Sequence, residues 1–331
     1  MSTAPPSRRV SRSTRRASDA SARASRSRSV STVHRRPQQG GGARRAAQRS
    51  DRGAGGARGD GSGSGRGSSD LVPRVAVALP AIAYAIFIIN SGGWVFALGV
   101  LVLGWIAVGE LGFAMRRARP PVAAAVAAVT AAVVAARTAG AEAVAVCVAA
   151  VLPLAFAALA ARRDRRHAAW GVAAAALATV WIGVPLAYAV LLRDLDHGAG
   201  LIVDVLIGTF LGDTAAYFGG RAFGATPLAP RISPNKTVEG FVCGVAGGTL
   251  AVWFAGLYQD WLSGTDALLL GAAVAIAAPL GDLFESLLKR DLGVKDLGRA
   301  FGAHGGVLDR LDAALFAIVV GYYVALALGF R

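Results

Sequence analysis

Stretches rich in Ala, Val, Leu, Ile and Gly follow one another from about residue 75 to the C-terminus. Most approach the roughly 20 residues that a helix needs to cross a bilayer core. Because backbone groups in lipid must be hydrogen-bonded within their own segment, each stretch is predicted to be a helix. The pattern predicts an all-α, polytopic transmembrane helix bundle of about nine spans, or eight if one short early stretch does not cross. The stretches are 75–89, 94–115, 121–136, 141–161, 168–192, 200–219, 238–258, 265–288 and 308–330.

Lys and Arg are concentrated in every second loop between these stretches. The other loops hold at most one Arg each. Since positive residues favour the cytoplasmic side, nine spans with the N-terminus in the cytoplasm and the C-terminus outside account for this alternation. The basic residues of the four loops are Arg116, Arg117 and Arg119, then Arg162, Arg163, Arg165 and Arg166, then Arg221, Arg231 and Lys236, and lastly Lys289, Arg290, Lys295 and Arg299.

The N-terminal 70 residues differ in composition from the rest of the chain. They are mainly Ser, Arg, Ala and Gly and cannot bury enough apolar surface to fold, so a disordered cytoplasmic tail is predicted. They hold 16 Arg against four Asp, a net +12 of the total +15. Attraction to anionic lipid headgroups is one alternative role for this tail. A membrane-anchored nucleic-acid binder would rest on the tail alone, and no specific nucleic-acid partner is expected.

The remaining 261 residues are strongly apolar, and the whole chain has a mean hydropathy of +0.50. Lipid is therefore the expected solvent for residues 71–199, the N-terminal spans, and 200–331, the C-terminal spans with their loops. The two cysteines, Cys147 and Cys243, lie in apolar stretches and are interpreted as small core residues.

Acidic side chains are concentrated in the last four stretches. Ionisable groups at membrane depth are costly, so they indicate an aqueous pocket or an ion site. Asp204 is the exception, because it is expected near the external end of its span, in the headgroup region. The acids are Asp204, Asp213, Asp282, Glu285, Asp309 and Asp312.

The segment Ser286–Asp312 joins the last two stretches and is dense in polar groups. Asp282, Ser286 and Lys289 are spaced i, i+4 and i+7 and share one helix face, while Asp309 and Asp312 share a face of the next helix. Two helices could thus bring three carboxylates together beside basic groups, as a Mg²⁺ ion carrying a polyphosphate requires. Asp282, Asp309 and Asp312 are the candidate metal ligands.

A second polar stretch, Asp213–Gly240, contains the sequence RISPNKT. Its Ser233, Lys236 and Thr237 can donate hydrogen bonds to phosphate oxygens. Gly305 and Gly306 would let a phosphate approach the backbone at the start of the last helix. Neither polar segment contains GxxxxGK[ST] or GxGxxG, which argues against P-loop and Rossmann nucleotide binding.

The segment Ser286–Asp312 resembles the signature of the phosphatidate cytidylyltransferase family over its whole length. The segment Asp213–Gly240 is similar to a second family segment. The resemblance covers residues 200–331 closely and the earlier spans by hydropathy alone. The matching positions are Ser286, Lys289, Arg290, Lys295, Asp296, Gly298, His304, Gly305, Gly306, Asp309, Arg310 and Asp312, and in the second segment Ala216, Tyr217, Phe223, Gly224, Ser233, Pro234, Lys236 and Thr237.

The resemblance implies metal-dependent transfer of a cytidylyl group from CTP to phosphatidic acid, in a polar funnel that faces the cytosol. Asp282, Asp309 and Asp312 would hold Mg²⁺, and with Lys289 they form the predicted catalytic set. Substrate contacts are expected from Ser286, Arg290, Lys295, His304, Arg310, Ser233, Lys236 and Thr237. The expected location is the cell membrane.

Two other functions remain open at this stage. A CTP-dependent lipid kinase of the polyprenol or phytol type would transfer the γ-phosphoryl group to an alcohol instead. An ion-coupled transporter would place its acids near the midplane in two repeats, which the sequence lacks. The sequence also leaves open whether the protein forms a homodimer, whether a monovalent cation joins Mg²⁺, and which acyl chains are accepted.

Overall fold

The computed structural model describes residues 71–163, 166–298, 300 and 305–331, and of residues 71–78 only the backbone. The predictions for the tail and for His304 lie outside these residues. The elements are α1 (Leu71–Ser91), α2 (Gly93–Ala114), the 3₁₀ turn η1 (Arg116–Ala118), α3 (Val122–Ala160), α4 (Ala168–Ala178), the π-helical turn η2 (Thr179–Gly183), α5 (Val184–Asp194), α6 (Gly198–Phe223), β1 (Pro227–Ala229), β2 (Ser233–Thr237), α7 (Val238–Gly256), α8 (Gly264–Leu292) and α9 (Leu308–Ala327).

Within the described part of the chain, seven helices are long and apolar enough to cross a membrane. They confirm the all-α, multi-pass architecture. The predicted stretch at 168–192 is one such helix, in which η2 joins α4 to α5 without a break. The seven helices are Gly93–Ala114, Val122–Ala160, Ala168–Asp194, Gly198–Phe223, Val238–Gly256, Gly264–Leu292 and Leu308–Ala327.

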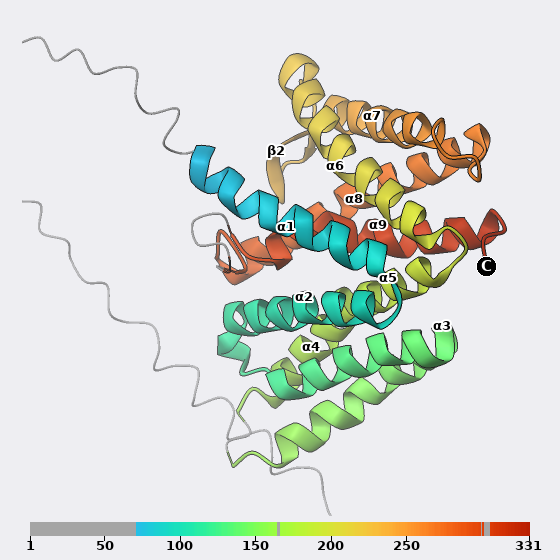
Figure 1. Ribbon diagram of the computed structural model, residues 1–331. Coiled ribbons are helices and arrows are strands. Elements are labelled where there is room, and N and C mark those ends of the chain that lie inside the picture. The colour runs from blue at the N-terminus through green and yellow to red at the C-terminus, as the bar shows by residue number, and fades with distance from the viewer. Residues whose placement is uncertain (1–70, 164–165, 299, 301–304) are drawn as a thin grey trace, which may run out of the picture. The chain divides into compact units, whose positions relative to one another are not determined.

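The predicted count of nine spans is not confirmed. One difference is α1, of which only Leu79–Ser91 is described with its side chains, and this part is shorter than the seven helices. The second is α3, whose 39 residues would extend about 58 Å at 1.5 Å per residue, about twice the bilayer core. Its continuity is interrupted at Gly140, where φ is +79° and ψ is −168°. The chain reverses direction within α3 (Figure 1). The count of nine spans stays a prediction.

Small residues set the spacing of the C-terminal helices. A Cβ on Gly248 of α7 would lie 2.6 Å from the carbonyl oxygen of Gly208 on α6, and one on Gly212 of α6 would lie 3.3 Å from that of Gly244. In lipid, helices associate largely through such close van der Waals packing. The tight α6–α7 pair is joined at one end by the hairpin of β1 and β2 (Figure 1).

The β1–β2 hairpin occupies the stretch that the sequence predicted to be a turn-rich loop. The two strands are antiparallel, with Pro227 opposite Thr237 and Ala229 opposite Ser233. α8 packs against α7, α9 and β2, and α5 packs against both α3 and α9. Through α5, the N-terminal helices and the C-terminal helices share one core. Its fully buried side chains include Leu111, Val129, Ile182, Leu192, Leu270 and Leu315.

Candidate active site

Three carboxylates from α8 and α9 meet at one point. Asp282 and Glu285 are three residues apart on α8 and share a face, and Asp312 comes from α9. Each offers an oxygen, and these oxygens all lie within 4.8 Å of one another. The helices approach closely here, because a Cβ on Gly281 would meet the carbonyl oxygen of Asp312. Gly281 therefore has a specific role, which is to let the acids of two helices meet.

Glu285 is the most enclosed member of this cluster, with 2% of its surface exposed. Its Oε2 accepts a hydrogen bond from the Lys289 Nζ at 2.5 Å. Its Oε1 has no hydrogen-bond partner among the described residues, although it is buried. A buried carboxylate oxygen without a donor is costly, so this atom is available to a ligand.

Two ammonium groups flank the carboxylates. Lys289 contacts both Glu285 and Asp309, the latter with its Nζ 2.8 Å from Oδ1. Lys236, from strand β2, forms an ion pair with Asp282. The Ser286 hydroxyl lies 3.4 Å from Asp282 Oδ1. Opposite charges thus alternate across the site, as expected where anionic phosphates and cations are to be held together.

Asp309 lies beside this cluster, paired with Lys289, and is not one of its three acids. Its expected role as a metal ligand stays a prediction. Its Oδ1 accepts a hydrogen bond from the backbone N–H of Leu297 at 2.9 Å. Its Oδ2 accepts from Gly298 at 3.2 Å and from Gly306 at 2.7 Å. Asp309 therefore ties together both ends of the connection between α8 and α9. Glu285 is the third acid of the cluster, because α8 presents positions 282 and 285 on the same face.

The β1–β2 hairpin is attached to the site at two points. Besides the ion pair of Lys236, the Arg290 Nε donates to the carbonyl oxygen of Ile232 at 3.2 Å. Thr237 serves as the N-cap of α7, where its hydroxyl accepts from the Gly240 N–H at 3.1 Å. Glu239 accepts from the backbone N–H groups of Ala225 and Thr226. The hairpin thus brings Lys236 to the carboxylates, while Thr237 is engaged in capping.

Three further predicted substrate contacts belong to β2, to the α8–α9 connection and to α9. Ser233 begins β2 and is half-buried, whereas Lys295 and Arg310 are exposed. Near the N-terminal end of α6, Asp204 is fully buried and accepts a hydrogen bond from Gln259 at 2.9 Å. It lies in the second turn of α6 and is enclosed by protein, and its expected place on the external side stays a prediction.

Sequence reasoning missed the roles of two glutamates. Glu285 was noted only as one of several acids, although its spacing of three from Asp282 and four from Lys289 was a usable signal. Glu110 was overlooked in the apolar stretch 94–115. Its carboxylate accepts hydrogen bonds from the backbone N–H groups of Ala300, Val307 and Leu308. An acid alone in an apolar helix was the signal that could have found it.

The sequence matches a known family over most of the described chain. The model of the cytidylyltransferase family matches residues 72–328. The chain belongs to this cytidylyltransferase family.

Curated relatives match this chain over shorter segments. The phosphatidate cytidylyltransferase of Mycobacterium leprae is 40% identical over 146 residues, which are 43% of this chain and 46% of the relative. That of Aquifex aeolicus is 43% identical over 127 residues, 37% of this chain and 46% of the relative. That of Helicobacter pylori strain 26695 is 45% identical over 123 residues, 37% of this chain and 45% of the relative. The chain thus spans about half the length of the curated relatives it matches.

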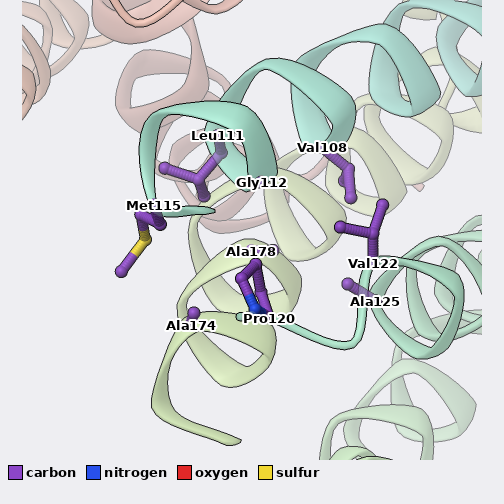
Figure 2. Close-up of a pocket in the computed structure, with 9 residues that line it drawn as sticks. All are labelled: Val108, Leu111, Gly112, Met115, Pro120, Val122, Ala125, Ala174 and Ala178. Atoms are coloured by element: carbon purple, nitrogen blue, oxygen red, sulfur yellow. The ribbon is translucent and has the colours of Figure 1, made fainter. Parts of the chain in front are cut away.

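The structure also has a pocket between α2, α3 and α4. Figure 2 shows its lining, which includes Val108 and Leu111 of α2, Val122 of α3 and Ala178 of α4. Every lining residue is uncharged. Such a pocket offers nothing to a phosphate or a cation, so the candidate active site is the polar centre between α8, α9 and the hairpin.

Proposed function

We propose that this protein is a phosphatidate cytidylyltransferase, which converts CTP and phosphatidic acid into CDP-diacylglycerol and pyrophosphate. The observation that carries the proposal is the cluster of Asp282, Glu285 and Asp312, flanked by Lys236 and Lys289. It lies in a chain built mostly of membrane-length helices, where a lipid substrate is within reach. The names of the curated relatives support the same reaction.

The chemistry asks the protein mainly to position two anions. A phosphate oxygen of phosphatidic acid bonds to the α-phosphorus of CTP, and the bond from that phosphorus to the leaving pyrophosphate breaks. Because the nucleophile is already an anion, no side chain must activate it. The work of the protein is alignment and charge neutralisation. Lys236, Lys289 and Arg290 suit this task, and the Ser286 hydroxyl can donate to a phosphate oxygen.

We further propose that the site binds Mg²⁺ through Asp282, Glu285 and Asp312. The donor set fits, because Mg²⁺ prefers oxygen ligands and is usually held by few carboxylates together with substrate phosphates. The partnerless Oε1 of Glu285 supports the same assignment. When bound, the ion would neutralise charge on the triphosphate. For Asp309 we propose a role as organiser of the α8–α9 connection. Its role as a metal ligand and the presence of a second, monovalent cation stay predictions.

The protein's place in the cell follows from the same reaction. We propose a multi-pass protein of the cell membrane, with its N-terminus and the site on the cytoplasmic side, where CTP is present. The alternating Lys and Arg loops support this orientation.

Transfer of label from CTP tests the proposed function. Full-length protein in detergent would be incubated with Mg²⁺, phosphatidic acid and CTP labelled on either the α- or the γ-phosphorus. Cytidylyl transfer puts the α label into lipid and releases the γ label as pyrophosphate. A lipid kinase would instead place the γ label in lipid, and a transporter would place neither there. Either of those two outcomes overturns the proposal.

A further inference from the structure

The carboxylate of Glu110 links the N-terminal helices to the connection between α8 and α9. Glu110 lies near the end of α2, and the residues it contacts are about 190 positions further along the chain. Its Oε1 accepts from the N–H groups of Ala300 and Val307, both at 3.2 Å. Its Oε2 accepts from the N–H of Leu308 at 3.0 Å. One side chain thus satisfies three backbone donors on a distant segment.

Two of these donors belong to the start of α9. Val307 is the N-cap residue of α9 and Leu308 is its first helical residue, and no side chain of the cap position satisfies the free N–H groups. Such groups need acceptors, and a negative charge at a helix N-terminus is favourable. The carboxylate of Glu110, which belongs to α2, supplies both the acceptor oxygens and the negative charge.

The backbone around Glu110 leaves room for the carboxylate by lacking side chains. A Cβ on Gly298 or on Gly306 would collide with the Glu110 carboxyl group, and its three nearest atoms all belong to Glu110. Neither glycine has a positive φ. The space for Glu110, and not the backbone conformation, therefore accounts for glycine at both positions.

The same segment is held from its other side by Asp309. Gly298 and Gly306 donate their N–H groups to Asp309, which also contacts Lys289, and Lys289 in turn contacts Glu285. A chain of direct contacts therefore runs from Glu110 through the segment to Asp309, Lys289 and the carboxylate cluster. Among the described residues, the hydrogen bonds of the Glu110 carboxylate are to backbone N–H groups and not to side chains assigned to substrate or metal.

We propose that Glu110 is a positioning residue of the active site. Its carboxylate fixes the two described ends of the α8–α9 connection, residues 297–298 and 305–308, so that Asp309 holds Lys289 beside Glu285. This inference rests on the proposed function and extends it to the N-terminal helices. Without Glu110, Asp309 and Lys289 remain present but lose their fixed placement.

A double-mutant cycle between Glu110 and Gly298 tests the proposal. The methyl group introduced by Gly298→Ala would compete with the Glu110 carboxylate for one space, so Glu110→Ala should relieve the defect of Gly298→Ala. Each single change should lower kcat at least about tenfold, the scale of lost hydrogen bonds to a charged group. The double variant should be no worse than the poorer single variant, whereas independent effects would multiply.

Kinetic constants distinguish positioning from general stabilisation. Because Glu110 is proposed to act through the α8–α9 connection, its loss should lower kcat more than it raises the KM for CTP. Glu110→Gln keeps the size but replaces one acceptor oxygen by an amide that cannot accept, so it should also be impaired. Glu142→Gln is the matched control, since Glu142 is an exposed acid of α3, and it should retain wild-type kcat.

Two results would overturn the proposal. One is a Glu110→Ala protein with a lower Tm but wild-type kcat, and the other is a pair of single effects that multiply in the double variant. If wild-type protein transfers no cytidylyl label, the proposed function fails independently. The double-mutant cycle is then carried out by measuring the Tm of each variant. Non-additive shifts in Tm support the Glu110–Gly298 contact, and additive shifts exclude it.

Discussion

Lys236 of the β1–β2 hairpin forms an ion pair with Asp282 of α8. The pair connects the polar segment Asp213–Gly240 with the acidic face of α8 that leads into Ser286–Asp312, and most of α7 and α8 lies between the two residues in the sequence. One carries a basic group for phosphate and the other carries the carboxylates. Because the ammonium lies beside an acid of the cluster, phosphate and metal contacts would be made within one site.

Loss of the Lys236 charge should weaken the binding of the anionic substrates. Lys236→Met removes a charged hydrogen-bond donor, and an increase of about tenfold or more in the KM for CTP or phosphatidic acid is expected. Lys236→Arg retains the charge and should recover part of the loss. Steady-state kinetics with each substrate varied would measure this, and unchanged KM values for both would contradict the role.

Magnesium titrations should separate Glu285 from Asp309. Glu285→Gln removes a proposed ligand charge, so the Mg²⁺ concentration for half-maximal turnover should rise at least about tenfold. Asp309→Asn loosens the α8–α9 connection instead, so kcat should fall at every Mg²⁺ concentration with little change in the half-maximal value. If added Mg²⁺ restores Asp309→Asn and not Glu285→Gln, the two roles have been assigned the wrong way round.

Asp312 and Asp204 provide a contrast between an acid at the site and an acid far from it. Asp312→Asn should reduce turnover by on the order of a hundredfold, because it removes charge at the reacting centre. Asp204→Asn keeps an oxygen that can accept from Gln259 and should leave turnover near the wild-type value. The measurement is turnover per inserted protein. Similar losses in both variants would argue against a special role for Asp312.

Gly281 should tolerate no side chain. A Cβ there would meet the backbone of Asp312, so Gly281→Ala must push α8 and α9 apart. Overpacking of this kind costs about 1–3 kcal/mol, and Tm and turnover should both fall. Gly109→Ala is the matched control, because a Cβ on that α2 glycine meets open space. Wild-type Tm and turnover in Gly281→Ala would show that the close approach is not required.

Membrane topology is the remaining prediction. Reporter fusions should place the N-terminus in the cytoplasm, the segment around Gly140 outside and the C-terminus outside, as nine spans require. If the reporter near Gly140 is cytoplasmic, α3 does not cross twice. A cytoplasmic C-terminus would favour eight spans.

Much of the fold was predictable from hydropathy. Lipid admits apolar side chains and requires hydrogen-bonded backbone, so each apolar stretch has essentially one solution, the helix. The break at Gly140 falls between the predicted stretches 121–136 and 141–161. The polar hairpin between α6 and α7 was located, although its two strands were not foreseen.

The sequence by itself determined which segments form apolar helices and which helix faces carry acids, because both depend on composition and spacing within one helix. Only the tertiary structure decided that Glu285 completes the carboxylate cluster, that Asp309 binds the backbone, and that Glu110 reaches the start of α9. Those facts depend on how far α8, α9 and α2 are apart and how they are rotated about their axes. Contacts between side chains and backbone of distant segments set that arrangement, and no periodicity within a single helix encodes it.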